Sequence, residues 1–167
     1  VHYLCGPCTG KYYEIDFRPQ DLMACMREDF GGDGMAMAEA YFESVKEVAA
    51  KKPTILGHFD LITKNNEKGK FIDITSKEYL DMGFAAIHEL QGKIPLFEVN
   101  TGAMARGYRT TPYPSAQWLR LLHEMGGRVT VSADAHHTSG VTCAFELAEQ
   151  MIKEAGFTEI WILQKEK

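Results

Sequence analysis

The sequence predicts an α/β protein organised around a parallel sheet. Short apolar runs rich in Val, Ile, Leu and Phe alternate along the chain with longer segments whose apolar residues recur at helical spacing. The connections between these segments are of ordinary length, which is typical of strands and helices that follow one another in a parallel sheet. With 167 residues the chain is long enough for one core, so we expect a single domain over 1–167.

The first part of the chain contains two predicted strands and two predicted helices. Residues 1–4 and 54–60 are apolar, partly β-branched runs that indicate short strands. A helix is expected over 18–30, and the glycine-rich stretch that follows ends it. A second helix is expected over 35–51, because its apolar residues fall on one face and its charged residues on the other.

The rest of the chain continues the alternation. Charged and polar residues at 64–70 indicate a loop, and the spacing of Thr75 and Glu78 is that of a capping box, which predicts a helix running to 91. The remaining predicted elements are, in order, a strand over 94–100, a loop over 103–113, a helix over 114–126, a strand over 129–137, a helix over 140–155 and a strand over 158–163.

The composition argues against several classes of partner. The formal net charge is −5 and the basic residues form no stripe, so we expect no nucleic-acid partner. No apolar run approaches the roughly 20 residues that cross a bilayer, so we expect no membrane partner. No targeting segment is visible, and the use of four cysteines favours reduced thiols. These features predict a cytoplasmic protein.

Three of the predicted strands end in polar residues that can carry chemistry. The pairs are His58 and Asp60, Glu98 and Asn100, and Asp134 and His136. The carboxyl ends of parallel strands meet on one rim of a sheet, where functional residues collect. Carboxylates and imidazoles can hold a divalent metal there, so we expect a metal site. Taken singly, His58 also fits a hydrogen-bonded core histidine, and Asp134 with His136 also fits a solvated turn.

Other side chains give weaker signals. Asp134 and His136 are two residues apart, so an extended backbone would point both to the same side. Arg106 and Arg109 follow the strand 94–100. Arginine binds oxyanions through paired hydrogen bonds, so either residue could bind an anion. The sequence is equally compatible with two solvated arginines. The histidines on predicted helices, His88 and His123, are given surface or packing roles.

Cys5 and Cys8, with Gly and Pro between them, match the C-x-x-C motif of thiol oxidoreductases. This match gives an alternative function, in which the two thiols carry disulfide chemistry. The residues after Cys8 are poor starters of the helix whose N-terminus lowers the thiol pKa in such enzymes. A zinc half-site is a further reading, but the sequence contains no second C-x-x-C to complete it.

Four short motifs occur in a fixed order along nearly the whole chain. They are Val-His-Tyr-Leu at 1–4, Leu-Gly-His-Phe-Asp at 56–60, Glu-Val-Asn-Thr-Gly at 98–102 followed by Tyr-Pro-Ser at 113–115, and Ser-Ala-Asp-Ala-His at 132–136. In this order they resemble the polymerase and histidinol phosphatase (PHP) family of metallohydrolases, most of all its histidinol-phosphatase-type members. The last motif is the most specific, and the ordered series is more specific than any one of its members.

The resemblance implies a partial, distorted (β/α)7 TIM-like barrel with parallel strands, whose N-terminal strands are missing and of which this chain is the C-terminal part. It implies metal-dependent hydrolysis of a phosphate monoester, with two or three Zn, Mn or Fe ions and a small phosphorylated metabolite as substrate. Matched residue by residue, His2 and His58 resemble ligands of one metal, Asp134 a ligand of its neighbour and His136 a ligand of the third. Asp134 and His136 are also the expected catalytic residues.

The resemblance further implies that Arg106 or Arg109 binds phosphate. Family members also carry a His-x-His, further His and a bridging Glu ahead of the stretch that matches 1–4, and the sequence contains none of these. We therefore expect the chain alone to bind metal weakly and to have little or no phosphatase activity. A non-catalytic binding domain that keeps the fold is the remaining alternative. An unpaired parallel edge is a liability, so we expect a homo-oligomer.

Overall fold

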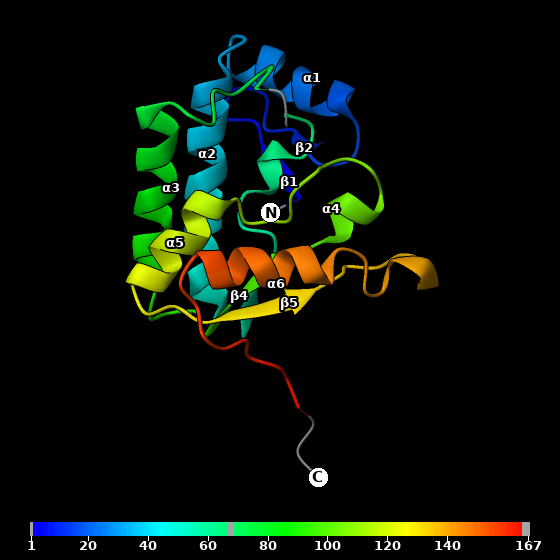
Figure 1. Ribbon diagram of the computed structural model, residues 1–167. Helices are drawn as coiled ribbons and strands as arrows, with labels where there is room; N and C mark the ends of the chain where they lie inside the picture. Colours follow the sequence, from blue (N-terminus) through cyan, green and yellow to red (C-terminus); the bar gives the residue numbers. More distant parts are fainter. Residues whose placement is uncertain (1, 67–68, 165–167) are drawn as a thin grey trace. The chain divides into compact units, whose positions relative to one another are not determined.

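The computed structural model describes residues 2–66 and 69–164 of the chain (Figure 1). It divides into two compact units, which are described here one after the other. The first unit comprises Val1–Lys51 and Leu61–Leu90, and the second comprises Lys52–Asp60 and Gln91–Lys167. Neither unit is continuous in sequence. The expectation of a single domain stays a prediction.

Three helices make up most of the first unit: α1 (Pro19–Asp29), α2 (Gly34–Glu47) and α3 (Lys77–Leu90). They confirm the helices predicted in this part of the chain. The carboxylate of Asp33 accepts the N–H groups of Met35 and Ala36 and thereby caps α2, which continues into a 3-10 turn at Val48–Lys51. Helices α2 and α3 lie side by side (Figure 1), and their buried rings of Phe42 and Tyr79 meet edge to face, 5.4 Å between centroids.

The start of α3 differs slightly from the prediction. The hydroxyl of Ser76 accepts the N–H of Tyr79, so Ser76 caps the helix in place of the predicted Thr75. Thr75 instead donates its hydroxyl to the carboxylate of Asp73, which forms a turn ahead of the helix. The capping-box spacing therefore located the helix but misplaced its first residue by one position.

The first unit also contains a two-stranded antiparallel ribbon, β1 (Tyr3–Cys5) and β2 (Tyr12–Glu14). The prediction that the opening strand joins the parallel sheet is wrong for the described residues, because β1 pairs with β2 alone. The loop between the strands is closed by hydrogen bonds from the N–H of Gly6 to the carbonyl of Lys11 and from the N–H of Gly10 to the carbonyl of Gly6. Sequence analysis did not predict β2, which is three residues long.

The second unit contains the predicted parallel sheet. Its strands are β3 (Ile55–Leu56), β4 (Leu96–Asn100) and β5 (Val129–Ser132), in the order β3-β4-β5. The register places Leu56 beside Phe97 and Asn100 beside Ser132, so the carboxyl ends of β4 and β5 are level. This arrangement confirms an α/β fold with a parallel sheet. It does not test the (β/α)7 barrel, which stays a prediction.

Helices α4 (Gly102–Ala105), α5 (Ala116–Glu124) and α6 (Phe145–Glu154) follow the strands of this sheet. Helix α6 contacts β5 and α5 (Figure 1). The predicted loop 103–113 thus begins as a short helix. Helix α6 begins five residues later than predicted, because residues 138–140 form a 3-10 turn and Ala144 is left-handed, with φ 59°. Buried apolar side chains of the second unit include Leu56, Phe59, Phe97, Val99, Trp118, Leu122, Val129 and Ile152.

The predicted final strand over 158–163 is wrong. The segment has no strand structure, and it contacts β5 through a backbone hydrogen bond from the N–H of Trp161 to the carbonyl of Val129. Its apolar residues Ile162 and Leu163 are exposed. The β-branched pattern was therefore present without the pairing that makes a strand.

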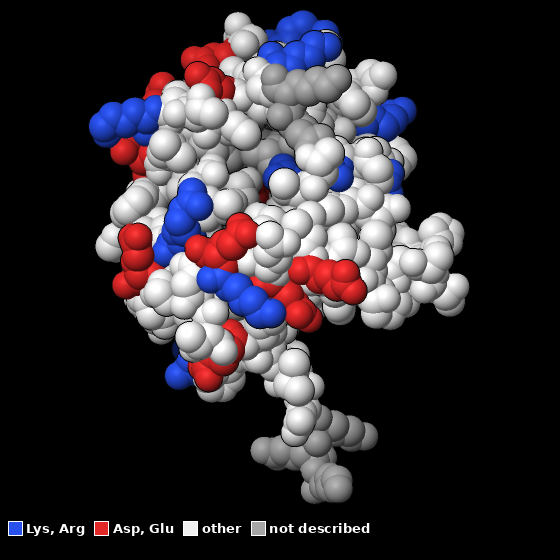
Figure 2. Space-filling view, viewed as in Figure 1, with Lys and Arg blue, Asp and Glu red and all other residues white. Residues whose placement is uncertain are grey.

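Charged side chains of both signs are interspersed among uncharged ones on the face shown in Figure 2. Within the described ranges, none of the helices combines the length and apolarity that a membrane crossing requires. The expectations of no nucleic-acid partner, no membrane partner and self-association stay predictions.

Candidate functional site

The carboxyl end of β4 holds a short polar network. Glu98 and Asn100 are two residues apart on the strand, so their side chains share one side of the sheet. The amide of Asn100 donates to Glu98 Oε2 (3.0 Å) and its Oδ1 accepts the N–H of Gly102 (2.8 Å). Asn100 therefore ties the end of the strand to the start of α4.

Glu98 also positions His58, which follows β3. Its Oε2 accepts the backbone N–H of His58 at 2.9 Å. His58 has φ 22°, outside the ordinary range for a residue with a side chain, and this bend ends the strand earlier than predicted. A Cβ on Gly57 would lie 3.3 Å from Glu98 Oε2, so the glycine leaves room for the carboxylate. The predicted pair His58 and Asp60 thus contacts the predicted pair Glu98 and Asn100, through the hydrogen bond from His58 to Glu98.

Asp60, Arg109 and Ser115 form a buried group that we call the Asp60 cluster. Asp60 is fully buried, and its Oδ2 accepts both the N–H (3.1 Å) and the hydroxyl (2.5 Å) of Ser115. Arg109 is also buried, and it donates to the Ser115 hydroxyl (3.4 Å) and to the carbonyl of Thr111 (3.2 Å). Its guanidinium lies 4.5 Å from the ring centroid of Tyr113. These contacts join the loop after β3 to the start of α5.

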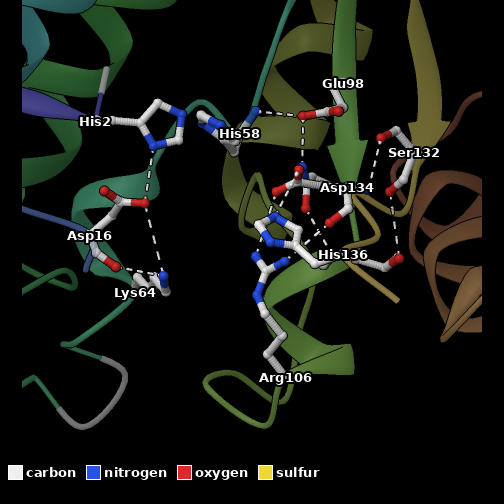
Figure 3. A network of polar contacts seen from close by, with 12 residues as sticks. His2, Asp16, His58, Lys64, Glu98, Arg106, Ser132, Asp134 and His136 are labelled. Atoms are coloured by element: carbon white, nitrogen blue, oxygen red, sulfur yellow. Dashed lines mark hydrogen bonds and ion pairs between the residues drawn. The ribbon is translucent and has the colours of Figure 1, made fainter. Parts of the chain in front are cut away.

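Arg106, Asp134 and His136 form a second group, the Asp134 cluster, which is open to solvent (Figure 3). Arg106 donates to the backbone carbonyl of Asp134 at 3.0 Å, and its other terminal nitrogen lies 3.5 Å from Asp134 Oδ2. The imidazole Nε2 of His136 lies 3.8 Å from Asp134 Oδ1. The structure thus brings together three of the residues that sequence analysis selected.

The backbone route to this cluster differs from the prediction. Strand β5 ends at Ser132, and Asp134 is left-handed with φ 43°, so the argument from an extended backbone over 129–137 was wrong. The hydroxyl of Ser132 accepts the N–H of Asp134 at 3.2 Å and stabilises the turn. A Cβ on Gly102 would lie 2.7 Å from the carbonyl oxygen of Ala133, so this turn packs against the glycine that begins α4.

A small cavity of about 50 Å³ lies at the Asp134 cluster. Its lining includes all three members of the cluster, together with His137 and Ser139. A guanidinium and imidazoles can bind an anion here, and a carboxylate with an imidazole can bind a metal. The donor types therefore fit both a divalent metal and a phosphate group.

The number of metal donors is smaller than a catalytic metal site needs. Within residues 2–66 and 69–164, no group of three or more His, Cys, Asp or Glu side chains is arranged to hold a metal ion. Catalytic zinc sites use three protein ligands. Asp134 and His136 alone would therefore be too few to hold a catalytic metal.

The predicted ligand His2 belongs to the first unit, next to β1. Its Nδ1 lies 3.0 Å from Asp16 Oδ2, and Lys64 donates to the Asp16 carbonyl (Figure 3). Burial raises the pKa of Asp16, but the hydrogen bond from His2 and the nearby charges of His2 and Lys64 outweigh it and hold the pKa below its usual value. Sequence reasoning missed Asp16, because the contact depends on the pairing of the two ends of the ribbon. The ligand role of His2 stays a prediction.

The C-x-x-C pair has a different setting from that of thiol oxidoreductases. Cys5 ends β1 and Cys8 lies in the following turn, and both thiols are free. The N–H groups of Cys8 and Thr9 donate to the carboxylate of Asp29, each at 2.8 Å, and the Cys8 thiol donates to the Asp29 carbonyl. The turn leads into β2, whereas the reactive thiol of thiol oxidoreductases lies at the start of a helix. The loop wraps Asp29, a residue that sequence analysis missed.

The two helical histidines make packing contacts. His88 on α3 stacks on Phe84 with 5.7 Å between ring centroids, and the ring of His123 on α5 meets Phe157 at 5.1 Å. These contacts confirm the surface or packing roles that the sequence predicted.

Comparisons with known proteins give one informative similarity. No family model matches the chain. The "Probable histidinol-phosphatase" of Schizosaccharomyces pombe (strain 972 / ATCC 24843) is 29% identical over 153 residues, which cover 90% of this chain and 49% of that protein. The chain spans about half the length of this curated relative. Over nearly all of its described length, the chain is therefore similar to a histidinol-phosphatase.

Proposed function

We propose that the Asp134 cluster belongs to the active site of a metal-dependent phosphoesterase of the PHP family, which hydrolyses a small phosphate monoester such as histidinol phosphate. The observation that carries the proposal is the cluster itself, in which a carboxylate, an imidazole and a guanidinium gather at the carboxyl end of a parallel sheet. The similarity to a histidinol-phosphatase supports the reaction class. Because the chain covers 49% of that relative, the activity is proposed for the protein as a whole.

Asp134 and His136 would hold the metal in this proposal. Their donor types suit zinc, manganese or iron, and their separation of 3.8 Å suits two ligands of one ion or of neighbouring ions. His2 and His58 are proposed as further ligands on the resemblance alone. When bound, the metal supplies a Lewis acid for the phosphate oxygens and makes hydroxide available at neutral pH.

The arginines of the second unit differ in what they can do for a phosphate. Arg106 is partly exposed, and its long contact of 3.5 Å to the Asp134 carboxylate leaves the guanidinium able to reach an oxyanion in the cavity. Arg109 is buried beneath the ring of Tyr113 and bonded to Ser115. We therefore propose that Arg106 binds the phosphate and that Arg109 stabilises the loop before α5.

The test combines metal binding with phosphate release. Zinc and manganese are titrated calorimetrically into the purified chain, and phosphate release from histidinol phosphate is measured with each metal. We expect weak metal binding and little turnover, because the described residues group two donors together. Asp134→Asn should remove most of the binding, since an amide is a poor metal ligand, whereas His88→Ala should leave it unchanged.

Two outcomes would contradict this proposal. If Asp134→Asn binds metal as the unaltered chain does, Asp134 is not a ligand. If the chain binds one or more metals tightly and turns over briskly, its ligand set is complete and the expectation of an inactive chain is wrong.

A further inference from the structure

A hollow of the first unit lies outside the residues of the proposed function. It measures about 410 Å³, which falls within the usual range of roughly 300–1,000 Å³ for small-molecule sites. Its walls come from the ribbon and from the start of α1. They include the aromatic rings of Tyr3, Tyr12 and Phe17 and the charged groups of Glu14, Arg18 and Asp21.

The register of the ribbon explains why aromatic rings face this hollow. Tyr3 lies opposite Glu14 and Tyr12 lies opposite Cys5, so these four side chains share one face of the ribbon. Leu4 and Tyr13 occupy the other face, where they are buried, although Tyr13 also lines part of the hollow. The exposed fractions of Tyr3, Tyr12 and Phe17 are 54%, 75% and 59%, which is unusual for three large rings around one hollow.

The charges in the hollow favour a cation. Arg18 donates to both carboxylate oxygens of Asp21, at 2.8 and 2.9 Å, so these two charges offset each other. Glu14 then leaves the walls with a net negative charge.

The hollow already contains one contact between a cation and a ring. The Arg18 guanidinium lies 5.6 Å from the centroid of Phe17. The faces of aromatic rings attract cations, and quaternary ammonium groups are bound in proteins by several rings together. The rings of Tyr3 and Tyr12 are exposed surfaces of the same kind.

We propose that this hollow is a binding site for a small organic cation, whose ammonium group would lie against the rings of Tyr3 and Tyr12 with Glu14 as its counter-charge. The proposal does not depend on phosphatase activity. It assigns the first unit a ligand-binding role of its own.

The test uses choline and its neutral isostere 3,3-dimethyl-1-butanol, each titrated into the purified chain at constant ionic strength and followed by NMR. We expect choline to bind and to shift the tyrosine ring signals, and the alcohol to bind at least about fivefold more weakly. Tyr12→Ala should weaken choline binding about fivefold, and Glu14→Gln should weaken it by a similar factor. Tyr108→Ala, which removes an exposed ring from the second unit, is the matched control and should leave binding unchanged.

Three results would overturn the proposal. Equal binding of choline and the alcohol would mean an apolar site without charge preference. Absence of choline binding, including the case in which a lysine-rich peptide binds instead, would mean that the surface is not a small-cation site. Unchanged choline affinity in Tyr12→Ala, whose ring is too exposed to be needed for folding, would place the binding elsewhere.

Discussion

Two aspartates of the second unit, each two residues from a histidine at the end of a parallel strand, have opposite environments. Asp60 is 0% exposed and accepts two hydrogen bonds from Ser115, whereas the Asp134 side chain is 40% exposed and its nearest cation, Arg106, is 3.5 Å away. The difference arises in the loops, because the segment before α5 covers Asp60, whereas among the described residues the Asp134 carboxylate has Arg106 and His136 as its neighbours. An Asp two positions from a His is thus a structural residue at Asp60 and a candidate ligand at Asp134.

The largest expected effect follows from removing Asp60. Asp60→Ala should destabilise the chain by about 3 kcal/mol, because it leaves two donors of Ser115 without their acceptor in a buried place. Asp134→Asn, which keeps a residue suited to the left-handed backbone, should change the free energy of unfolding by about 0.5 kcal/mol or less, as for most exposed positions. Urea unfolding of both variants measures the difference. Equal destabilisation would show that burial does not distinguish the two aspartates.

A second prediction concerns the turn that carries Asp134. Gly102→Ala should destabilise the chain by about 2 kcal/mol, because its Cβ would lie 2.7 Å from the carbonyl oxygen of Ala133 and 3.0 Å from the Asp134 Cβ. Gly140→Ala is the matched control, since its Cβ would meet ordinary contacts of 3.6 and 3.8 Å. Thermal unfolding compares the two. If Gly140→Ala costs as much as Gly102→Ala, the close approach at Gly102 is not what holds the turn.

Much of the fold could be predicted because each long element carries its own signal. Helices α1, α2 and α3 have helical apolar spacing with a proline or a polar cap at the start, and the apolar residues Leu96, Phe97 and Val99 mark β4. Strand β2 carries no such signal, since its three residues are ordered by pairing with β1. The segment 158–163 has the composition of a strand but makes one backbone hydrogen bond to β5.

The location of the candidate site could be predicted from the sequence, but the roles of its residues could be predicted less well. Parallel strands place Glu98, Asp60 and Asp134 on one rim, and that follows from the alternation of elements. The roles depend on partners far along the chain. Asp60 is paired with Ser115, which is 55 residues away, and no spacing within the motif indicates that contact.

Removing Ser115 tests the same comparison with a smaller change. Ser115→Ala should cost about 1 kcal/mol, because Asp60 keeps the backbone N–H of residue 115 as a donor. Ser132→Ala, which removes the equivalent hydroxyl beside Asp134, should cost less, since that hydroxyl accepts a single exposed bond of 3.2 Å. A double-mutant cycle of Ser115→Ala with Asp60→Asn should show coupling. Additive effects would mean that the hydroxyl does not stabilise Asp60.

The last comparison concerns a third aspartate, Asp29 of the first unit, whose contribution to stability depends on pH. Burial raises its pKa, but hydrogen bonds from the Tyr13 hydroxyl, from the N–H and hydroxyl of Thr9 and from the N–H of Cys8 outweigh this and lower the pKa from 3.8 to about 2. A carboxyl with a lowered pKa stabilises the folded chain above pH 3.8, and that contribution is lost as the pH falls toward 2. Asp29→Asn should therefore flatten the decline of the unfolding temperature between pH 4 and pH 2. A decline that persists in Asp29→Asn would assign the acid sensitivity to other carboxyls.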